Sequence, residues 1–169
     1  MDVFVARQPI FNRHRRIFAY ELLFRDGESN AFPGIDGDRA TSRLLSSSFF
    51  TVGIKQITSG NRAFINFTKD MLLRGIPAMF PPQLVVVEIL EDVQPTEEVV
   101  SACQILVDKG YMLALDDFVY SGEYAPLLEI AKIIKVDFMQ SSMNQIRQLV
   151  EMSQKYHCKL LAEKIETYE

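Results

Sequence analysis

The sequence predicts an α/β protein with a mainly parallel sheet or barrel. From residue 60 onward, short apolar or β-branched runs alternate with longer segments of helical periodicity. Such a series of βα units is typical of sheets whose neighbouring strands run parallel. The composition agrees, because 48% hydrophobic residues in a chain of 169 are enough for a sizeable buried core. We therefore expect a single domain over residues 1–169.

The N-terminal part is predicted to form a β-hairpin followed by a helix. The two arms of the hairpin lie in VFVARQPIF and AYELLFR, and the charged segment NRHRR (12–16) is the turn between them. The segment DRATSRLLSSSFFTVGIKQI (38–57) has the pattern of a helix that leads into the next strand.

Five further strands are predicted from apolar and β-branched runs at 63–67, 84–90, 112–118, 132–138 and 158–165. Helices are predicted at 68–75, 95–110, 123–131 and 143–157. The run LVVVEIL (84–90) is nearly continuous in apolar residues, as expected of a strand that is buried on both faces. In the helix at 95–110, Pro95 suits the first turn, and Lys109 and Gly110 mark the end.

Composition and charge exclude several classes of protein. A net charge of −4 argues against a general nucleic-acid binder, so DNA is not an expected partner. No stretch approaches the roughly 18 apolar residues of a membrane span, and the N-terminus lacks the apolar centre of a signal peptide. Cys103 and Cys158 lie in apolar periodic segments, which is typical of buried, reduced thiols. We infer a cytoplasmic protein.

Polar side chains that could bind a cation recur where the apolar strands end. They are Glu21, Asn66, Glu88, Asp116, Asp117, Lys135, Asp137 and Glu163. Period-two alternation puts these groups on common faces, so they gather at one mouth if those faces point into a barrel. Any one of them could instead be a helix cap, a turn residue or a solvated rim residue. The recurrence of such polar residues in six strands is harder to explain in this way, because burying several carboxylates without a cation is very unfavourable.

The adjacent Asp116 and Asp117 indicate the kind of cation. Two neighbouring carboxylates repel each other unless positive charge lies beside or between them. Oxygen ligands without histidine or cysteine suit Mg²⁺ or Mn²⁺, and the aspartates could place one carboxylate on each of two ions. Two such ions can activate a water for displacement at phosphorus, while a lysine favours hydroxide and a glutamate takes its proton. The residues therefore predict metal-assisted phosphodiester hydrolysis.

These residues, in this order, resemble the EAL domain, a family of cyclic di-GMP phosphodiesterases and their degenerate relatives. The matching elements span the whole chain and are ELLFR (21–25), Asn66, EILE (88–91), DDF (116–118), KVD (135–137) and AEKIET (162–167). The opening ARQPIF and YELLFRDG is similar to the EAL half of EAL-HDOD signalling proteins. The resemblance implies an incomplete TIM-like (β/α) barrel of the EAL type. It would have an N-terminal β-hairpin and an antiparallel first strand, and would lack the closing βα elements.

The resemblance also implies roles for individual residues in the hydrolysis of cyclic di-GMP to pGpG. The implied ligands of a two-ion Mg²⁺ or Mn²⁺ site are Glu21, Asn66, Glu88, Asp116 and Asp117. Lys135 would assist the attacking water, and Glu163 would be the general base. The implied substrate-binding residues are Arg25, Leu23 and Asp137, and Glu91 would anchor the loop that follows the aspartates.

The sequence departs from the family pattern at several points. The DDF motif continues as VYSG instead of Gly-Thr-Gly, the alanine of the namesake motif is Leu22, and the glycine after the implied base is Lys164. Val119 and Ser121 do not tolerate the backbone angles of glycine, so the loop is expected to adopt another conformation. Lys164 adds bulk and positive charge near the pocket. The family's closing βα elements, with a Gln-Gly segment that lines the pocket, have no counterpart in these residues.

Two functions are consistent with this pattern. One is a metal-dependent cyclic di-GMP phosphodiesterase, and the other is a non-catalytic degenerate EAL module that binds cyclic di-GMP or a protein partner as a regulator. We expect little hydrolysis by the 169-residue chain, because a pocket without one wall cannot preorganise its substrate. We also expect self-association through the exposed edges of the unclosed barrel, and an HDOD domain in the parent protein.

Overall fold

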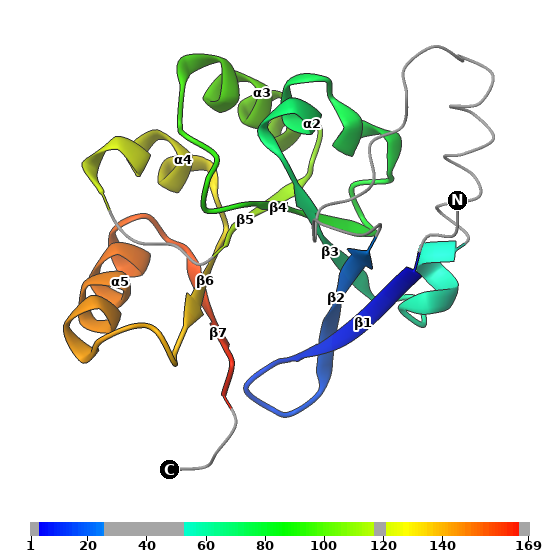
Figure 1. The fold of residues 1–169 in the computed structure, drawn as a ribbon, viewed down its shortest axis with the longest axis horizontal. Helices are drawn as coiled ribbons and strands as arrows, with labels where there is room; N and C mark the ends of the chain where they lie inside the picture. Colours follow the sequence, from blue (N-terminus) through cyan, green and yellow to red (C-terminus); the bar gives the residue numbers. More distant parts are fainter. Residues whose placement is uncertain (1–3, 26–52, 117–120, 166–169) are drawn as a thin grey trace.

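A curved seven-stranded sheet is the central feature of the computed structural model, which describes residues 4–25, 53–116 and 121–165. The strand order is β1-β2-β3-β4-β5-β6-β7, with β1 antiparallel to β2 and each later pair of neighbours parallel. Figure 1 shows these strands arranged as an incomplete barrel with the helices on its outside. The prediction of an incomplete TIM-like barrel with an N-terminal hairpin and an antiparallel first strand is confirmed.

The elements follow one another closely along the chain. The strands are β1 (Phe4–Phe11), β2 (Ile17–Arg25), β3 (Arg62–Phe67), β4 (Val85–Ile89), β5 (Met112–Leu115), β6 (Ile133–Asp137) and β7 (Lys159–Glu163). The helices are α2 (Lys69–Leu73), α3 (Glu97–Asp108), α4 (Ala125–Ile130) and α5 (Met143–Lys155), with short 3₁₀ helices η1 (Ile76–Met79) and η2 (Gly122–Tyr124). Residues 53–57 are helical, whereas the rest of the helix predicted over 38–57 lies outside the described residues.

Helix α3 begins at Glu97, two residues later than the sequence pattern indicates. Thr96 has the extended backbone of an N-cap (φ −65°, ψ 158°), so Pro95 precedes the cap. The prediction that Pro95 lies in the first turn of the helix is therefore wrong. The acidic residues Glu97 and Glu98 follow in the first turn, where they complement the positive end of the helix dipole. At the other end, Gly110 has a φ of +89°, a left-handed conformation that glycine adopts without strain.

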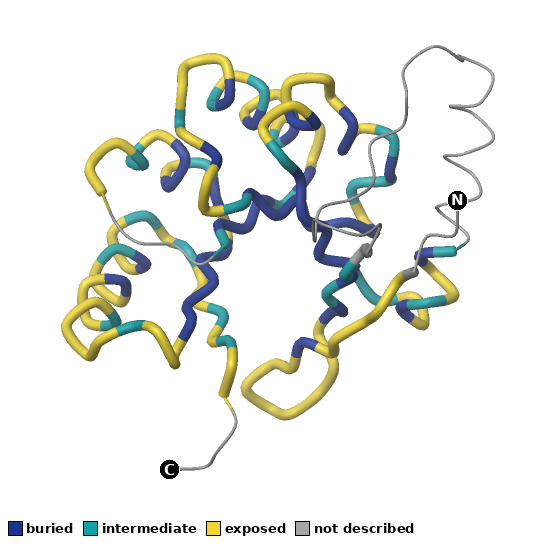
Figure 2. Tube along the Cα trace, in the orientation of Figure 1, coloured by how far each residue is buried: buried dark blue, intermediate teal, exposed yellow. Residues whose placement is uncertain are grey.

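Side-chain alternation along the strands produces two separate apolar cores. The outer core fills the space between the sheet and the helices, and it includes Ile65, Val87 and Leu113 from the strands and Leu106 and Leu127 from the helices. The inner core lies inside the curve of the sheet and is made of Ile10, Ala19, Phe64, Val86, Ala114 and Ile133, with Met112 and Leu161 packed against it. Figure 2 shows the buried residues concentrated along the central strands. The central strands are therefore covered on both faces.

The two outermost strands of the described sheet are β1 and β7. Among the described strands, β1 pairs with β2 and β7 pairs with β6, and no pairing joins β1 to β7. Leu160 in β7 is 38% exposed, and most of β1 is also exposed. Along one edge of each of these two strands, the backbone hydrogen-bonding groups are therefore not paired with another described strand.

Two exclusions from the sequence analysis bear on the fold. In the part of the chain that the structure describes, no helix is both long enough and apolar enough to span a bilayer. Both cysteines are free, as predicted. Cys103 is fully buried, and burial raises the pKa of its thiol to about 12.

Replacing Phe64 by alanine should destabilise the protein strongly. Phe64 is completely buried in the inner core and makes an edge-to-face contact with Phe18, with ring centroids 6.4 Å apart. We expect Phe64→Ala to lower the free energy of unfolding by about 3–5 kcal/mol, measured by urea denaturation. In the control Ile105→Ala, which truncates a side chain that is 51% exposed, the change should stay within about 0.5 kcal/mol. Equal losses in the two variants would contradict the inner core.

Candidate active site

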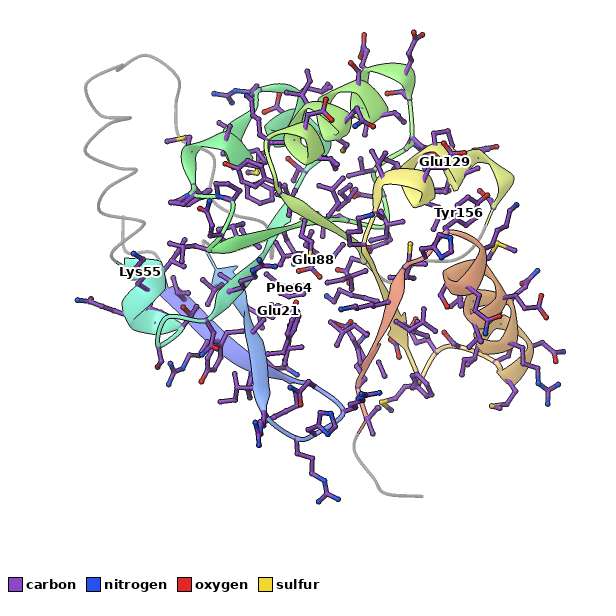
Figure 3. All side chains as sticks on the ribbon, turned by 180° about the vertical axis from the view of Figure 1, so that it is seen from behind. Glu21, Lys55, Phe64, Glu88, Glu129 and Tyr156 are labelled. Atoms are coloured by element: carbon purple, nitrogen blue, oxygen red, sulfur yellow. The ribbon has the colours of Figure 1, made fainter. Side chains whose placement is uncertain are left out.

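Five predicted site residues converge on the interior of the sheet, above the inner core. Glu21 lies in β2, Glu88 in β4 and Lys135 in β6, whereas Asp116 directly follows β5 and Glu163 ends β7. Each lies two positions after an inner-core residue of its own strand, as in the pairs Val86 with Glu88 and Ile133 with Lys135. Figure 3 shows Glu21 and Glu88 beside Phe64 in the space that the sheet encloses.

The ammonium group of Lys135 is the centre of this cluster. Its Nζ lies 2.8 Å from Asp116 Oδ1, 2.8 Å from Glu163 Oε1 and 3.4 Å from Glu21 Oε1. It also donates a hydrogen bond to Glu88 Oε1. The Lys135 side chain is only 2% exposed and that of Glu88 is fully buried, whereas Glu21, Asp116 and Glu163 are 13–17% exposed. The five side chains therefore form a nearly dry ionic network that opens on one side.

The tilt of the strands brings these residues together, because they are not level in the backbone ladder. Glu21 pairs with Phe64, one inward-facing position before Asn66, which pairs with Glu88. Glu88 in turn is level with Ala114 and Ile133, one inward-facing position before Lys135. Strands that close toward a barrel tilt and shear relative to one another, so residues from successive levels can meet at one point. Spacing along the sequence does not reveal this shear.

Burial and mutual charge shift the pKa values of three members of the cluster. Burial raises the pKa of Glu88 well above its ordinary value; Lys135 opposes this shift, and Asp116 and Glu21 reinforce it. Burial by itself would lower the pKa of Lys135, but the carboxylates of Glu88, Asp116, Glu21 and Glu163 raise it above its ordinary value. Burial raises the pKa of Glu163 to about 7, against the opposing effect of Lys135. A carboxyl group with such a pKa can exchange a proton near neutral pH.

The cluster also fits a metal ion. Glu21, Glu88 and Glu163 each offer a carboxylate oxygen, and these oxygens lie within 4.8 Å of one another. Two buried oxygens, Asn66 Oδ1 and Glu88 Oε2, have no hydrogen-bond partner among the described residues. Buried oxygens without a partner are costly, and a divalent cation that prefers oxygen ligands would satisfy them. Asp117, the remaining predicted ligand, lies outside the described residues.

Asp137 is bound within the protein by three donors. Its Oδ1 accepts hydrogen bonds from the backbone N–H groups of Met139 (2.8 Å) and Gln140 (3.1 Å), and its Oδ2 lies 2.5 Å from Lys164 Nζ. The hydrogen bond from Lys164 lowers the pKa of this carboxyl, with help from the two backbone donors and against the opposing effect of burial. Asp137, predicted to bind substrate, thus organises the chain after β6. Lys164 was predicted to lie near the pocket, but its ion pair with Asp137 could not be read from the sequence.

The remaining predicted residues lie around the cluster. Leu23 lines a cavity of about 610 Å³ between β1 and β7, together with Glu21, Glu163 and Lys164. Arg25 ends β2, and its side chain lies outside the described residues. Glu91 is exposed in the turn after β4, and its backbone oxygen lies 3.4 Å from the hydroxyl group of Tyr124, which follows the DDF loop. The structure thus brings Leu23 to the site, and it leaves Glu91 at a distance along β4 from the ionic network.

Two curated proteins are similar to the chain in sequence, although no protein-family model matches it. The uncharacterized protein YuxH of Bacillus subtilis is 43% identical over 175 residues, which is 99% of this chain and 42% of YuxH. The cyclic di-GMP phosphodiesterase CdgJ of Vibrio cholerae is 44% identical over 167 residues, which is 97% of this chain and 39% of CdgJ. The chain thus spans about two fifths of the length of these relatives.

The fold is similar to that of solved EAL-domain structures. The Bacillus subtilis YkuI protein, with an EAL domain, in complex with its substrate cyclic di-GMP and calcium, superposes with a TM-score of 0.68. The match covers 98% of this chain and 50% of YkuI, at 16% sequence identity. At this identity, the comparison supports the fold and leaves the roles of individual residues as predictions.

The variant Lys164→Ala should be less stable than the variant Lys164→Gly. Its φ is +53°, in the left-handed region where a side chain costs about 1 kcal/mol or more and glycine does not. Both substitutions remove the ion pair with Asp137, so their difference isolates the backbone strain. We expect Lys164→Gly to be about 1 kcal/mol more stable than Lys164→Ala in urea denaturation.

The matched control is Gln148, an exposed residue in the middle of α5. At this position the order should reverse, with alanine about 0.5–1 kcal/mol more stable than glycine, because the helical backbone favours alanine. The same order at both positions would show that Lys164 carries no left-handed strain.

Proposed function

We propose that the chain is an EAL-type cyclic di-GMP signalling domain that binds cyclic di-GMP beside the Lys135 cluster. The same site would hydrolyse the dinucleotide to pGpG with the help of divalent cations, with little turnover by these 169 residues alone. One observation carries this proposal: four carboxylates in or directly after different strands surround one ammonium, and buried oxygens of Asn66 and Glu88 have no partner among the described residues. The similarity to CdgJ, which is named as a cyclic di-GMP phosphodiesterase, supports the choice of substrate.

The proposed metal ions are Mg²⁺ or Mn²⁺, because every available donor is an oxygen. The residues that would hold them are Glu21, Asn66, Glu88, Asp116 and Asp117. Bound there, the ions would supply Lewis-acid stabilisation of phosphoryl oxygens and lower the pKa of a bound water. The proximity of the Glu21 and Glu88 oxygens supports two of these ligands. The buried oxygens Asn66 Oδ1 and Glu88 Oε2, which have no partner among the described residues, support Asn66 and Glu88.

Glu163 and Lys135 are the proposed catalytic residues. The Glu163 carboxylate, with a pKa of about 7, is suited to accept the proton of the attacking water. The Lys135 ammonium, 2.8 Å from Glu163, would orient this water and stabilise negative charge on it. Leu23, Arg25 and Asp137 are the proposed contacts to the dinucleotide, and Glu91 is the proposed anchor of the DDF loop.

A second candidate is a non-catalytic module that binds cyclic di-GMP or a protein partner as a regulator. The Lys164–Asp137 ion pair favours the non-catalytic module, because Lys164 occupies a carboxylate that substrate would otherwise contact. The unpaired edges of β1 and β7 favour it as well, since the cavity between them is bounded by strands that are not joined to each other. A loosely bounded pocket binds a ligand more readily than it orients one for reaction.

Partners of the domain are proposed as well. We propose that residues 1–169 form one domain, that the free edges of β1 and β7 promote self-association, and that an HDOD domain is present in the parent protein. Light scattering over a range of concentrations measures the self-association. A constant monomeric mass would exclude it.

Two substitutions should separate catalysis from binding. Asp116→Ala removes a proposed ligand, so it should abolish both the hydrolysis and the metal-supported binding of cyclic di-GMP. Glu163→Gln removes the base but keeps the shape, so it should reduce turnover at least about 100-fold and change the binding constant less than about threefold. Titration calorimetry measures binding in the presence of Mn²⁺, and chromatography of the same samples measures pGpG.

The unsubstituted chain gives the reference for these variants. Binding with pGpG formation supports the phosphodiesterase, and binding without product supports the regulatory module. No binding with or without Mn²⁺ would contradict both.

Removal of divalent metal should abolish binding of cyclic di-GMP by the chain. The dinucleotide carries two phosphodiester charges, and the carboxylates around Lys135 would repel it in the absence of added positive charge. We expect the affinity to fall at least tenfold in EDTA and to recover with Mn²⁺, measured by titration calorimetry. An affinity that EDTA leaves unchanged would show that metal does not support binding.

A further inference from the structure

Lys135 occupies the position of a cation in the carboxylate cluster. Its ammonium contacts four carboxylates, from Glu21, Glu88, Asp116 and Glu163, and it is almost completely buried. With all five groups ionised, the cluster carries a net charge of −3. A buried group of this charge is held together only if positive charge lies among the carboxylates. In the described residues, Lys135 is the basic side chain within ion-pair distance of Glu88.

The same carboxylates are the ones that the divalent cations would use. Glu21, Glu88 and Glu163 offer the oxygens that can hold a metal, and all three contact the Lys135 ammonium. Of these three, Glu21 and Glu88 are the proposed ligands. Glu88 is divided between the two roles, because its Oε1 accepts from Lys135 and its buried Oε2 has no partner. Two cations a few ångströms apart in a buried site repel each other strongly. The ammonium and a metal ion therefore compete for Glu21 and Glu88.

We propose that Lys135 is the internal counter-ion of the metal-free site, and that divalent metal displaces its ammonium from Glu21 and Glu88. The inference rests on the proposed metal site and adds a control of its occupancy. Without bound metal, Lys135 stabilises the carboxylate cluster, and by the same contacts it weakens metal binding. The displaced ammonium retains Glu163, which lies 2.8 Å away at the more exposed side of the cluster. Metal loading thereby leaves Lys135 paired with the proposed base.

The test compares Lys135→Met with Lys135→Arg and with Lys132→Met. Methionine keeps the apolar stem of lysine and removes the charge, whereas arginine keeps the charge. Lys132 is exposed just before β6, so its replacement removes the same charge outside the cluster. Titration calorimetry with MnCl₂ measures affinity, and calorimetric melting with EDTA or MnCl₂ measures stability.

Lys135→Met should bind Mn²⁺ at least about tenfold more tightly than the unsubstituted chain, because the competing charge is gone. Its melting temperature in EDTA should fall by at least about 5 °C, and Mn²⁺ should restore most of this loss. Lys135→Arg should bind Mn²⁺ no more tightly than the unsubstituted chain, and Lys132→Met should change the affinity less than about twofold. Equal or weaker Mn²⁺ binding by Lys135→Met would overturn the proposal.

A second measurement needs no folded methionine variant. In the unsubstituted chain labelled with ¹⁵N-lysine, the Nζ resonance of Lys135 is identified by its loss in Lys135→Arg. Titration with diamagnetic Mg²⁺ should shift this resonance in proportion to metal occupancy and leave that of Lys132 in place. Mg²⁺ binding with an unchanged Lys135 resonance would overturn the displacement and leave the metal site standing. Failure of every variant to bind Mg²⁺ or Mn²⁺ would overturn the metal site as well.

Discussion

The structure depends on the contacts of four carboxylates inside a curved sheet with a single buried ammonium. Taking carboxylates out of water is very unfavourable unless opposite charge and hydrogen bonds replace the lost hydration. Lys135 provides both, with contacts to carboxylates from four other strands. The same contacts bring the proposed base, Glu163, and three proposed metal ligands around one ammonium, so the groups whose pairing stabilises the fold are also those proposed to carry the chemistry.

The inner core determines where this network lies. The inside of the curve is filled by Phe64, Val86, Ala114 and Ile133. The polar residues two positions further along the strands therefore lie together on one side of this inner core. The outer core packs the opposite faces of the same strands against the helices, which fixes which side chains of each strand point inward and which point outward. A shift of one residue in any strand would exchange a site residue for a core residue. The two apolar cores thus position the charges.

The wall formed by β7 and the segment after it distinguishes this chain from the family pattern. Lys164 occupies a left-handed backbone position where the family has glycine, and its ammonium ties Asp137 to the end of β7. The pair links β6 and β7 immediately beside Glu163. Glu163 therefore contacts the Lys135 network on one side and is followed directly by Lys164, whose side chain pairs with Asp137.

The sequence by itself determined the order and type of the elements and the parity of the strands, because periodicity and turn residues are local properties. It thereby selected Glu21, Asn66, Glu88, Asp116, Lys135 and Glu163 as inward-facing polar residues. Only the tertiary structure decided which of them meet, because strand tilt brings residues from successive ladder levels onto Lys135. It also decided that Asp137 is bound by Lys164 and two backbone donors. These outcomes depend on distances between strands that local sequence patterns do not contain.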